Sequence, residues 1–244
     1  MKIVSWNCNG AFRKKFGALI ALDADVCVIQ ECEDPARCEN PEYKAWASNF
    51  LWVGTNKNRG LGVFAKQGIS LEQICLDAGS LELFLPCIVA GNISFLAVWT
   101  RQANSPTFRY IGQLWKYLQK HRDFLRHEQA VCIGDLNSNA CWDVWDRWWN
   151  HSDVLKELQD VGLESAYHFA RAETQGQESR PTFFMHRQLE KPYHIDYAFL
   201  SQSLLRNATV EIGEPNEWLE YSDHMPLIVR IMANSNVMPI LGSI

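Results

Sequence analysis

The stretch that most constrains the fold is Val131–Asn137, which reads VCIGDLN. Its apolar residues predict a buried strand, and Gly134 allows the backbone to turn sharply where that strand ends. Asp135 and Asn137 then present a carboxylate and an amide from the end of a rigid strand, where such groups can hold a nucleophile and a charged oxygen. The alternative is a structural junction in which one of these side chains caps a following helix.

Two stretches near the N-terminus end in the same way. Lys2–Trp6 predicts a short strand followed by Asn7, and Ala24–Gln30 predicts a second strand followed by Glu31. Apolar residues at helical spacing between Phe12 and Leu22 predict an amphipathic helix that joins them. This βαβ-like arrangement places Asn7 and Glu31 at one edge of a sheet. The alternative for Glu31 is a solvated acid in a loop.

The C-terminal part adds a third pair of polar groups. His194–Leu200 alternates like a strand and carries Asp196 in its middle, where an aspartate is unfavourable without a partner. The natural partner is the segment Ser222–Pro226, which contains Asp223 and His224 and precedes an apolar strand. We therefore expect Asp196 and His224 to meet.

The middle of the chain predicts strands between 50 and 99 and then a helix over Tyr110–Phe124. Arg109, Tyr110 and Gln113 lie at the start of this helix, where free backbone N–H groups favour a phosphate. A tyrosine packed on the rim of the core is the alternative. Further along, Trp142, Trp145 and Trp149 recur at helical spacing. We favour core packing for them over a base-stacking surface, because tryptophan is buried on average.

Length and composition bound the class of protein. A chain of 244 residues with 47% hydrophobic content fits one large α/β domain or two small ones. No linker or repeat divides it, so we predict one domain over residues 1–233 and a loose tail over 234–244. Its eight cysteines form no CxxC pair, which favours reduced thiols of a cytoplasmic protein over disulfides or zinc. No apolar run is long enough for a membrane span.

The net charge of −5 argues mildly against nonspecific nucleic-acid binding. Basic residues nevertheless outnumber acids between Arg101 and Arg126, and Arg13–Lys15 forms a second cluster. A local phosphate-facing surface is therefore compatible with an acidic chain. Its predicted substrate-binding members are Arg101, Arg109, Gln113 and Lys116, and helix spacing places Lys120 on the same face as Lys116.

Five short motifs in this order resemble the endonuclease/exonuclease/phosphatase superfamily, nearest its exonuclease III and AP-endonuclease type. They are WNCNG at 6–10, IQE at 29–31, GDLN at 134–137, HIDY at 194–197 and SDHMPL at 222–227. The resemblance spans nearly the whole chain. It implies a four-layer α/β sandwich, with two mixed β-sheets packed face to face and helices outside. It also implies a divalent metal, Mg²⁺ or alternatively Mn²⁺, and cleavage of a phosphate ester.

The resemblance also implies roles at matching positions. Glu31 and Asn7 resemble the main metal ligands, and Asp223 a residue near a second metal or one that positions the site. Asp135 resembles the group that orients and deprotonates the attacking water. Asn137 would hold that water or a phosphate oxygen.

His224 resembles the group that stabilises the pentacovalent transition state, and Asp196 the residue that sets its tautomer. Tyr110 would touch the scissile phosphate. Two departures are visible: Asn9 stands where some AP endonucleases carry an aspartate, and the short loop over 180–194 shows no apolar wedge for an abasic site.

Three functions remain open at this point. The leading hypothesis is a magnesium-dependent phosphodiesterase that acts on nucleic acid, DNA before RNA, as a cytoplasmic monomer. The acidic isoelectric point and compact loops favour a second hypothesis, a phosphatase or phosphodiesterase for a small phosphorylated molecule such as an inositol phosphate. The third hypothesis is a non-catalytic binding module. The presence of a suitable residue at every catalytic position of the family argues against it.

Overall fold

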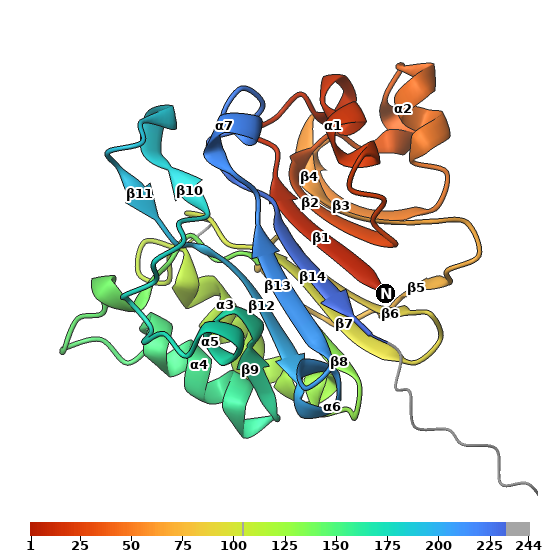
Figure 1. Ribbon diagram of the computed structural model, residues 1–244. Helices are drawn as coiled ribbons and strands as arrows, with labels where there is room; N and C mark the ends of the chain where they lie inside the picture. Colours follow the sequence, from red (N-terminus) through yellow and green to blue (C-terminus); the bar gives the residue numbers. More distant parts are fainter. Residues whose placement is uncertain (104, 233–244) are drawn as a thin grey trace, which may run out of the picture.

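Strands from both ends of the chain form the first sheet of the protein (Figure 1), whose computed structural model describes residues 1–103 and 105–232. These strands are β1 (Lys2–Asn7), β2 (Val26–Cys32), β3 (Phe50–Asn56), β4 (Arg59–Ala65), β13 (Ala208–Ile212) and β14 (Leu227–Ile231). They lie in the order β13–β14–β1–β2–β4–β3. β1 and β2 are parallel and the other neighbours antiparallel, so the sheet is mixed.

The second sheet comes from the middle of the chain. Its strands are β5 (Leu71–Gln73), β6 (Phe84–Val89), β7 (Ile93–Trp99), β8 (Ala130–Asp135), β9 (Leu163–Ser165) and β12 (Asp196–Ser201), in the order β5–β6–β7–β8–β12–β9. β7 and β8 are its parallel pair. A small hairpin of β10 (Phe183–Phe184) and β11 (Pro192–Tyr193) projects beyond it (Figure 1).

Alternation along the strands builds the layers. Ile3 and Val28 of the first sheet share one apolar cluster with Val131 and Ile133 of the second, and this cluster fills the space between the sheets. Val4, Trp6 and Ile29 belong to a different cluster on the outer face of the first sheet. Because successive strand residues point to opposite faces, each sheet needs a cover on its outer side.

Helices cover both outer faces. The first sheet packs against η1 (Phe12–Lys14), α1 (Phe16–Ile20), η2 (Pro35–Arg37), α2 (Pro41–Trp46) and α7 (Pro215–Trp218), and the second against α3 (Ile111–His121), η3 (Arg122–Leu125) and α4 (His151–Asp160). The shorter η4 (Ala140–Trp142), α5 (Ala166–Arg171), η5 (Met185–Arg187) and α6 (Gln202–Leu205) lie in connections. The four-layer α/β sandwich is thus confirmed.

Several local predictions need correction or confirmation. The helix expected between Phe12 and Leu22 is divided at Lys15 into a 3₁₀ turn and a short α-helix. All eight cysteines are free thiols, as expected, although Cys75 and Cys141 are exposed. Among the described residues, no helix has the length and apolar character that crossing a membrane requires. The predicted tail over 234–244 lies outside the described residues.

The prediction that the tryptophans after β8 pack in the core on one side of a helix is wrong. Trp142 is 43% exposed and Trp145 is 96% exposed, and only Trp149 packs partly against the apolar cluster of the second sheet. Asp143 and Asn150 accept hydrogen bonds from neighbouring backbone N–H groups, and these bonds stabilise turns in place of a helix.

Candidate active site

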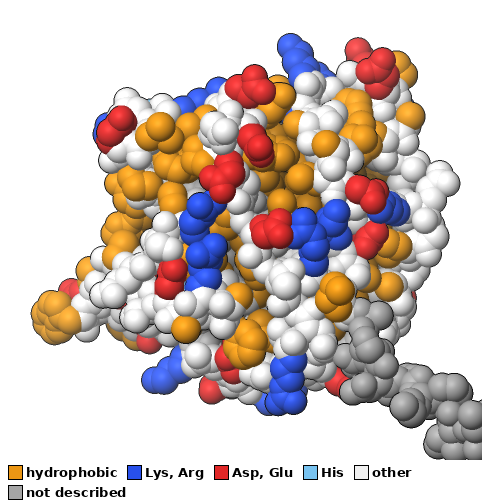
Figure 2. Space-filling view, viewed as in Figure 1, with side chains coloured by type: hydrophobic (Ala, Val, Ile, Leu, Met, Phe, Trp, Pro, Cys, Tyr) orange, Lys and Arg blue, Asp and Glu red, His pale blue; other side chains and the backbone are white. Residues whose placement is uncertain are grey.

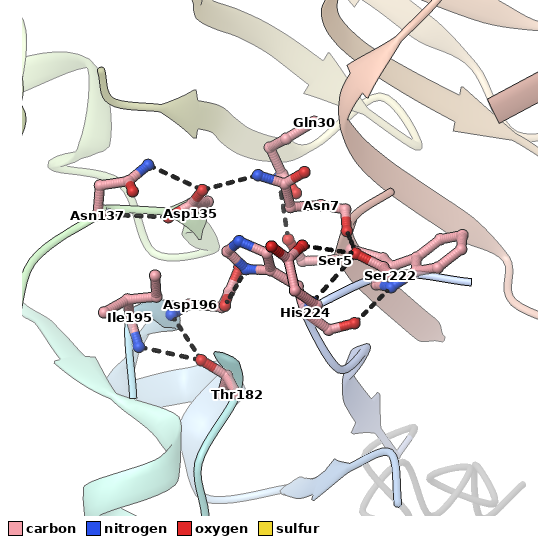
Figure 3. A network of polar contacts seen from close by, with 12 residues as sticks. Ser5, Asn7, Gln30, Asp135, Asn137, Thr182, Ile195, Asp196, Ser222 and His224 are labelled. Atoms are coloured by element: carbon pink, nitrogen blue, oxygen red, sulfur yellow. Dashed lines mark hydrogen bonds and ion pairs between the residues drawn. The ribbon is translucent and has the colours of Figure 1, made fainter. Parts of the chain in front are cut away.

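Asp135 lies at the end of the buried strand β8, as the sequence predicts. Its carboxylate accepts hydrogen bonds from the backbone N–H of Asn137 (2.8 Å) and from the Asn137 side-chain amide (2.9 Å). That amide also donates to the carbonyl of Thr100 at 2.9 Å. Asn137 adopts a left-handed backbone (φ 44°), which folds its side chain back over Asp135 (Figure 3).

Asn7 connects the two sheets at this point. Its side-chain amide donates to Asp135 Oδ2 at 2.9 Å and to Glu31 Oε1 at 3.4 Å. Asn7 and Glu31 come together because β1 and β2 are parallel neighbours whose C-terminal ends meet at one edge. Glu31 is 8% exposed and pairs with the Arg59 guanidinium at 2.5 Å. Both predicted strand ends therefore converge on Asp135.

His224 and Asp196 meet, as expected. His224 Nδ1 lies 2.9 Å from Asp196 Oδ2, and both side chains are almost fully buried (Figure 3). Asp196 is the first residue of β12, not a central one, and lies opposite Asp135 in the antiparallel pair β8–β12. This position corrects the prediction and explains how the carboxylate is tolerated, because the strand end opens onto the site.

Hydrogen bonds hold the backbone on either side of this pair. The Thr182 hydroxyl accepts from the N–H groups of Ile195 and Asp196, both at 3.0 Å. The Ser222 hydroxyl accepts from the N–H of His224 at 3.0 Å and donates to the carbonyl of Asn7 at 2.7 Å. The connection preceding β14 is therefore fastened directly to the end of β1.

Burial and charge shift the acidity of these groups. Burial of Asp135, followed by the charge of Asp196, raises its carboxyl pKa to about 7. Burial alone would lower the pKa of the His224 imidazole. The carboxylates of Asp196 and Asp135 outweigh that effect and raise the pKa to about 9. A carboxyl that titrates near neutrality and a stable imidazolium thus lie side by side.

The donor set fits a divalent cation. One oxygen or nitrogen of each of Asp135, Asp196 and His224 lies within 4.8 Å of the others, and the two carboxylates are the candidate ligands among them, because a protonated imidazole has no free lone pair. Asp196 Oδ1 is buried and, among the described residues, makes no hydrogen bond. The carboxylates of Glu31 and Asp135 add oxygen atoms, which are the ligands that Mg²⁺ prefers. The residues at this edge are therefore suited to a hard cation.

The predicted substrate-binding residues lie on the loop and helix that follow Thr100. Tyr110 precedes α3, is 41% exposed and has a positive φ of 50°. Arg109 and Lys116 are exposed, and the Lys116 ammonium lies 4.8 Å from the centre of the Phe108 ring.

Two others make internal contacts. Gln113 is buried, and its amide donates to the carbonyl of Phe108. Arg101 pairs with Glu82 at 2.6 Å. Asp223 is half-buried, and its carboxylate is one of the charges that raise the pKa of His224.

Three residues at the site were not predicted: Arg59, Thr182 and Ser222. Arg59 reaches Glu31 because β2 and β4 are antiparallel neighbours, a pairing that no local pattern reveals. Thr182 and Ser222 act through hydroxyl hydrogen bonds that depend on the tertiary fold. Ser222 lies within the SDHMPL motif, so its place beside Asp223 and His224 was the one signal that the sequence offered for it.

Two mixed sheets whose strand ends bring together Asn7, Asp135, Asp196 and His224 define an α/β sandwich with a buried acidic site at one edge. The model of the Endonuclease/Exonuclease/phosphatase family matches residues 4–224. The chain belongs to this family, which confirms the resemblance noted from its motifs. No curated protein matches the chain by sequence.

Solved structures with the same fold include nucleases. The chain is similar to a 3'-5' exonuclease from Neisseria meningitidis, with 19% identity, coverage of 95% of this chain and 99% of that one, and a TM-score of 0.70. It is also similar to an AP endonuclease from Archaeoglobus fulgidus (15% identity, 96% and 100% coverage, TM-score 0.69). A truncated TDP2 from Caenorhabditis elegans matches at 14% identity, with 95% and 97% coverage and a TM-score of 0.66.

Proposed function

We propose that the protein is a divalent-metal-dependent phosphodiesterase that hydrolyses phosphate esters of nucleic acid, with DNA as the first expectation. The observation that carries this proposal is the convergence of Asn7, Asp135, Asp196 and His224, drawn from both sheets, on one buried site. The site combines a buried carboxylate, an amide and an imidazole paired with a second carboxylate. General-base catalysis and stabilisation of negative charge at phosphorus need this set of groups.

Glu31 and Asn7 would hold a Mg²⁺ or Mn²⁺ ion, with Asp223 near it. When bound, the ion supplies positive charge that polarises a phosphate oxygen. In the structure the Arg59 guanidinium supplies the positive charge beside the Glu31 carboxylate. The site suits a divalent cation because of its carboxylate oxygens and because Asp196 Oδ1 is buried without a hydrogen-bond partner among the described residues.

The chain's own residues would carry the reaction. Asp135 accepts the proton of the attacking water, and Asn137 orients that water or a phosphate oxygen. His224, as the imidazolium, stabilises the charge that develops on the phosphate oxygens. Asp196 keeps the His224 proton on Nδ1 through their 2.9 Å contact, which leaves Nε2 to face the substrate.

Tyr110 would contact the scissile phosphate. Its backbone conformation is sparsely populated for a residue with a side chain and costs on the order of 1–3 kcal/mol. Such strain is concentrated at functional positions, which supports a role for Tyr110 beyond packing.

Two observations support nucleic acid as the substrate. The structural neighbours include a 3' phosphatase from Neisseria bound to a product DNA hairpin. In addition, Arg109 and Lys116 are exposed and take part in no ion pair among the described residues. By contrast, Arg101 and Lys120 of the predicted basic surface pair with Glu82 and Asp77.

The test is an assay of purified protein with Mg²⁺ and with Mn²⁺ on four substrates: duplex DNA with an abasic site, DNA with recessed 3' ends, single-stranded RNA and inositol phosphates. We expect cleavage of DNA that stops on chelation and that weakens with salt. Each phosphate contact adds about 0.9 to the log–log salt slope for duplex DNA. Lys116→Ala should reduce that slope, whereas Lys120→Ala, whose ammonium already pairs with Asp77, is the matched control.

Asp135→Asn and His224→Ala proteins serve as controls for contaminating nucleases. Turnover confined to the inositol phosphates would replace the nucleic-acid proposal with that of a small-molecule phosphatase. Equal cleavage by wild type and by both variants would assign the activity to a contaminant and contradict the proposed site.

A further inference from the structure

Three tryptophans are exposed at the end of η4 and in the loop that leads from it to α4. Trp142 is 43% exposed, Trp145 is 96% exposed and Trp148 is 66% exposed. We call residues 142–148 the tryptophan loop. Figure 2 shows hydrophobic side chains at the left of the view, over this loop and the β10–β11 hairpin above it. Exposed large apolar side chains that gather in one place mark interaction sites.

Hydrogen bonds hold the tryptophan loop in this shape. The Asn150 side chain accepts from the Val144 N–H (3.0 Å) and from Arg147 Nε (2.8 Å), and it donates to the carbonyls of both residues (3.0 and 2.5 Å). Asp143 accepts from the N–H groups of His151 and Ser152 at the start of α4. The indoles are therefore displayed by a braced loop, which lowers the entropic cost of binding a partner.

A row of rings leads from this loop to the candidate active site. The Phe183 ring lies 4.6 Å from the His224 ring, and Tyr193 lies 6.3 Å from Phe183. Trp142 then lies 5.3 Å from Tyr193. All three distances join ring centroids. Trp142 is thus the outer end of a row of rings that begins at the buried imidazole of His224.

Cations accompany this surface. Arg147 donates to the carbonyl of Trp142 at 3.2 Å, and its guanidinium lies 4.5 Å from the Trp149 ring centre. The Lys116 ammonium lies over the Phe108 ring, and the Phe108 ring centre lies 5.4 Å from that of the same Trp149. Asp146 is the exposed acid of the loop, since Asp143 is engaged with α4. Aromatic faces beside Arg and Lys are the combination that single-stranded nucleic acid requires.

We propose that Trp142 and Trp145 form a stacking surface for unpaired bases of the strand whose phosphate lies at His224. This inference rests on the proposed function, because it is the candidate active site that orients the strand. It goes beyond that function by assigning a binding site outside the catalytic groups and a preference for single-stranded over fully paired nucleic acid. Stacking on a ring face tolerates any base, so the preference concerns strandedness and not sequence.

The experiment measures binding of a fluorescently labelled single strand by anisotropy, with EDTA present to prevent cleavage. DNA and RNA strands of one sequence form separate arms, and the blunt duplex is a third. Trp145→Ala and Trp142→Ala should each weaken single-strand binding by about five- to a hundredfold, the range for loss of one stacked base. Trp145→Phe, which keeps a ring, should restore most of the affinity.

Phe169→Ala removes a half-exposed ring on α5 and should leave binding unchanged. A strand in which several nucleotides lack bases should bind wild type as weakly as the complete strand binds the double variant Trp142→Ala/Trp145→Ala, and the double variant should lose no further affinity for that baseless strand. Trp145 touches so little of the protein that this variant should fold normally, as circular dichroism can verify.

Equal affinity of wild type and Trp145→Ala for the single strand would overturn the proposal, as would an equal loss on the duplex. Conversion of a wild-type dimer into a monomer by Trp145→Ala, seen by sedimentation, would instead assign the surface to a contact between copies. Hydrolysis of bis(4-nitrophenyl) phosphate, which has no bases, is followed in parallel. If wild type fails on it, the proposed function fails while the binding results still decide the stacking surface.

Discussion

Replacing Asp196 by asparagine should lower the pKa of His224 while the imidazole stays in the same place. The amide keeps the shape of the side chain and an oxygen that can accept the Nδ1 proton, but it removes the carboxylate that lies 2.9 Å away. Two unit charges about 4 Å apart interact by about 4 kcal/mol at an effective dielectric constant of about 20. This energy corresponds to about three pKa units. We therefore expect the His224 pKa to fall from about 9 by about two units or more, with Asp135 limiting the fall.

The same change should alter how stability depends on pH. His224 has a folded-state pKa of about 9 against 6.5 for an ordinary histidine, so the folded protein holds the proton more tightly than the unfolded chain. The resulting stabilisation, about 3 kcal/mol, is fully present below pH 6.5 and is lost as the pH rises through about 9. In Asp196→Asn this decline between pH 6.5 and 9 should largely disappear.

Both quantities are measured on metal-free protein. Heteronuclear NMR of the imidazole nitrogens gives the His224 pKa, and urea unfolding across the same pH range gives the stability. Asp77→Asn is the matched control, because it removes an exposed carboxylate that pairs with Lys120 on the surface. A His224 pKa that is the same in Asp196→Asn and wild type, or unfolding curves with the same pH dependence, would refute the electrostatic account of this pair.

Three further predictions address the strand ends. Glu31→Gln removes the charge that now pairs with Arg59 and should raise the Mg²⁺ concentration for half-maximal activity; unchanged metal dependence and rate would exclude Glu31 from the site. Asp135→Asn should lower turnover by about a hundredfold or more while urea unfolding shows an intact fold, and a variant that keeps most activity would contradict the role of base. Gly134→Ala would place a Cβ 1.8 Å from the Val98 carbonyl oxygen and should cost about 2 kcal/mol or more in unfolding free energy. An unchanged urea midpoint would show that β7 and β8 can separate without cost.

Much of the candidate site was predictable because its members end apolar strands. Asn7, Glu31 and Asp135 each follow a run that must be buried, and polar groups at the ends of neighbouring strands meet at one edge of a sheet. Asp196 was predictable as a partner of His224 because an aspartate in an apolar strand needs a counter-group. The ordered motifs added the four-layer arrangement, which the strand pattern alone does not specify.

Other members of the site depend on pairings between distant segments. Arg59 meets Glu31 only through the register of β2 against β4. Thr182 and Ser222 use hydroxyls to hold backbone groups that lie far away in the sequence, and a hydroxyl has no local signature for such a role. Gln113 illustrates the reverse case, since a polar residue at a helix start faces the preceding loop instead of solvent.

The tryptophan loop shows most clearly the difference between what the sequence determines and what the tertiary structure decides. The sequence by itself determined which side chains favour burial, and this was enough to predict most of the buried strands. Whether Trp145 is covered depends on whether another layer lies over it, and turns stabilised by Asp143 and Asn150 point it into solvent. The hydrophobic effect rewards burial wherever it occurs. Only the tertiary structure decides which apolar side chains find a partner within the chain and which remain exposed.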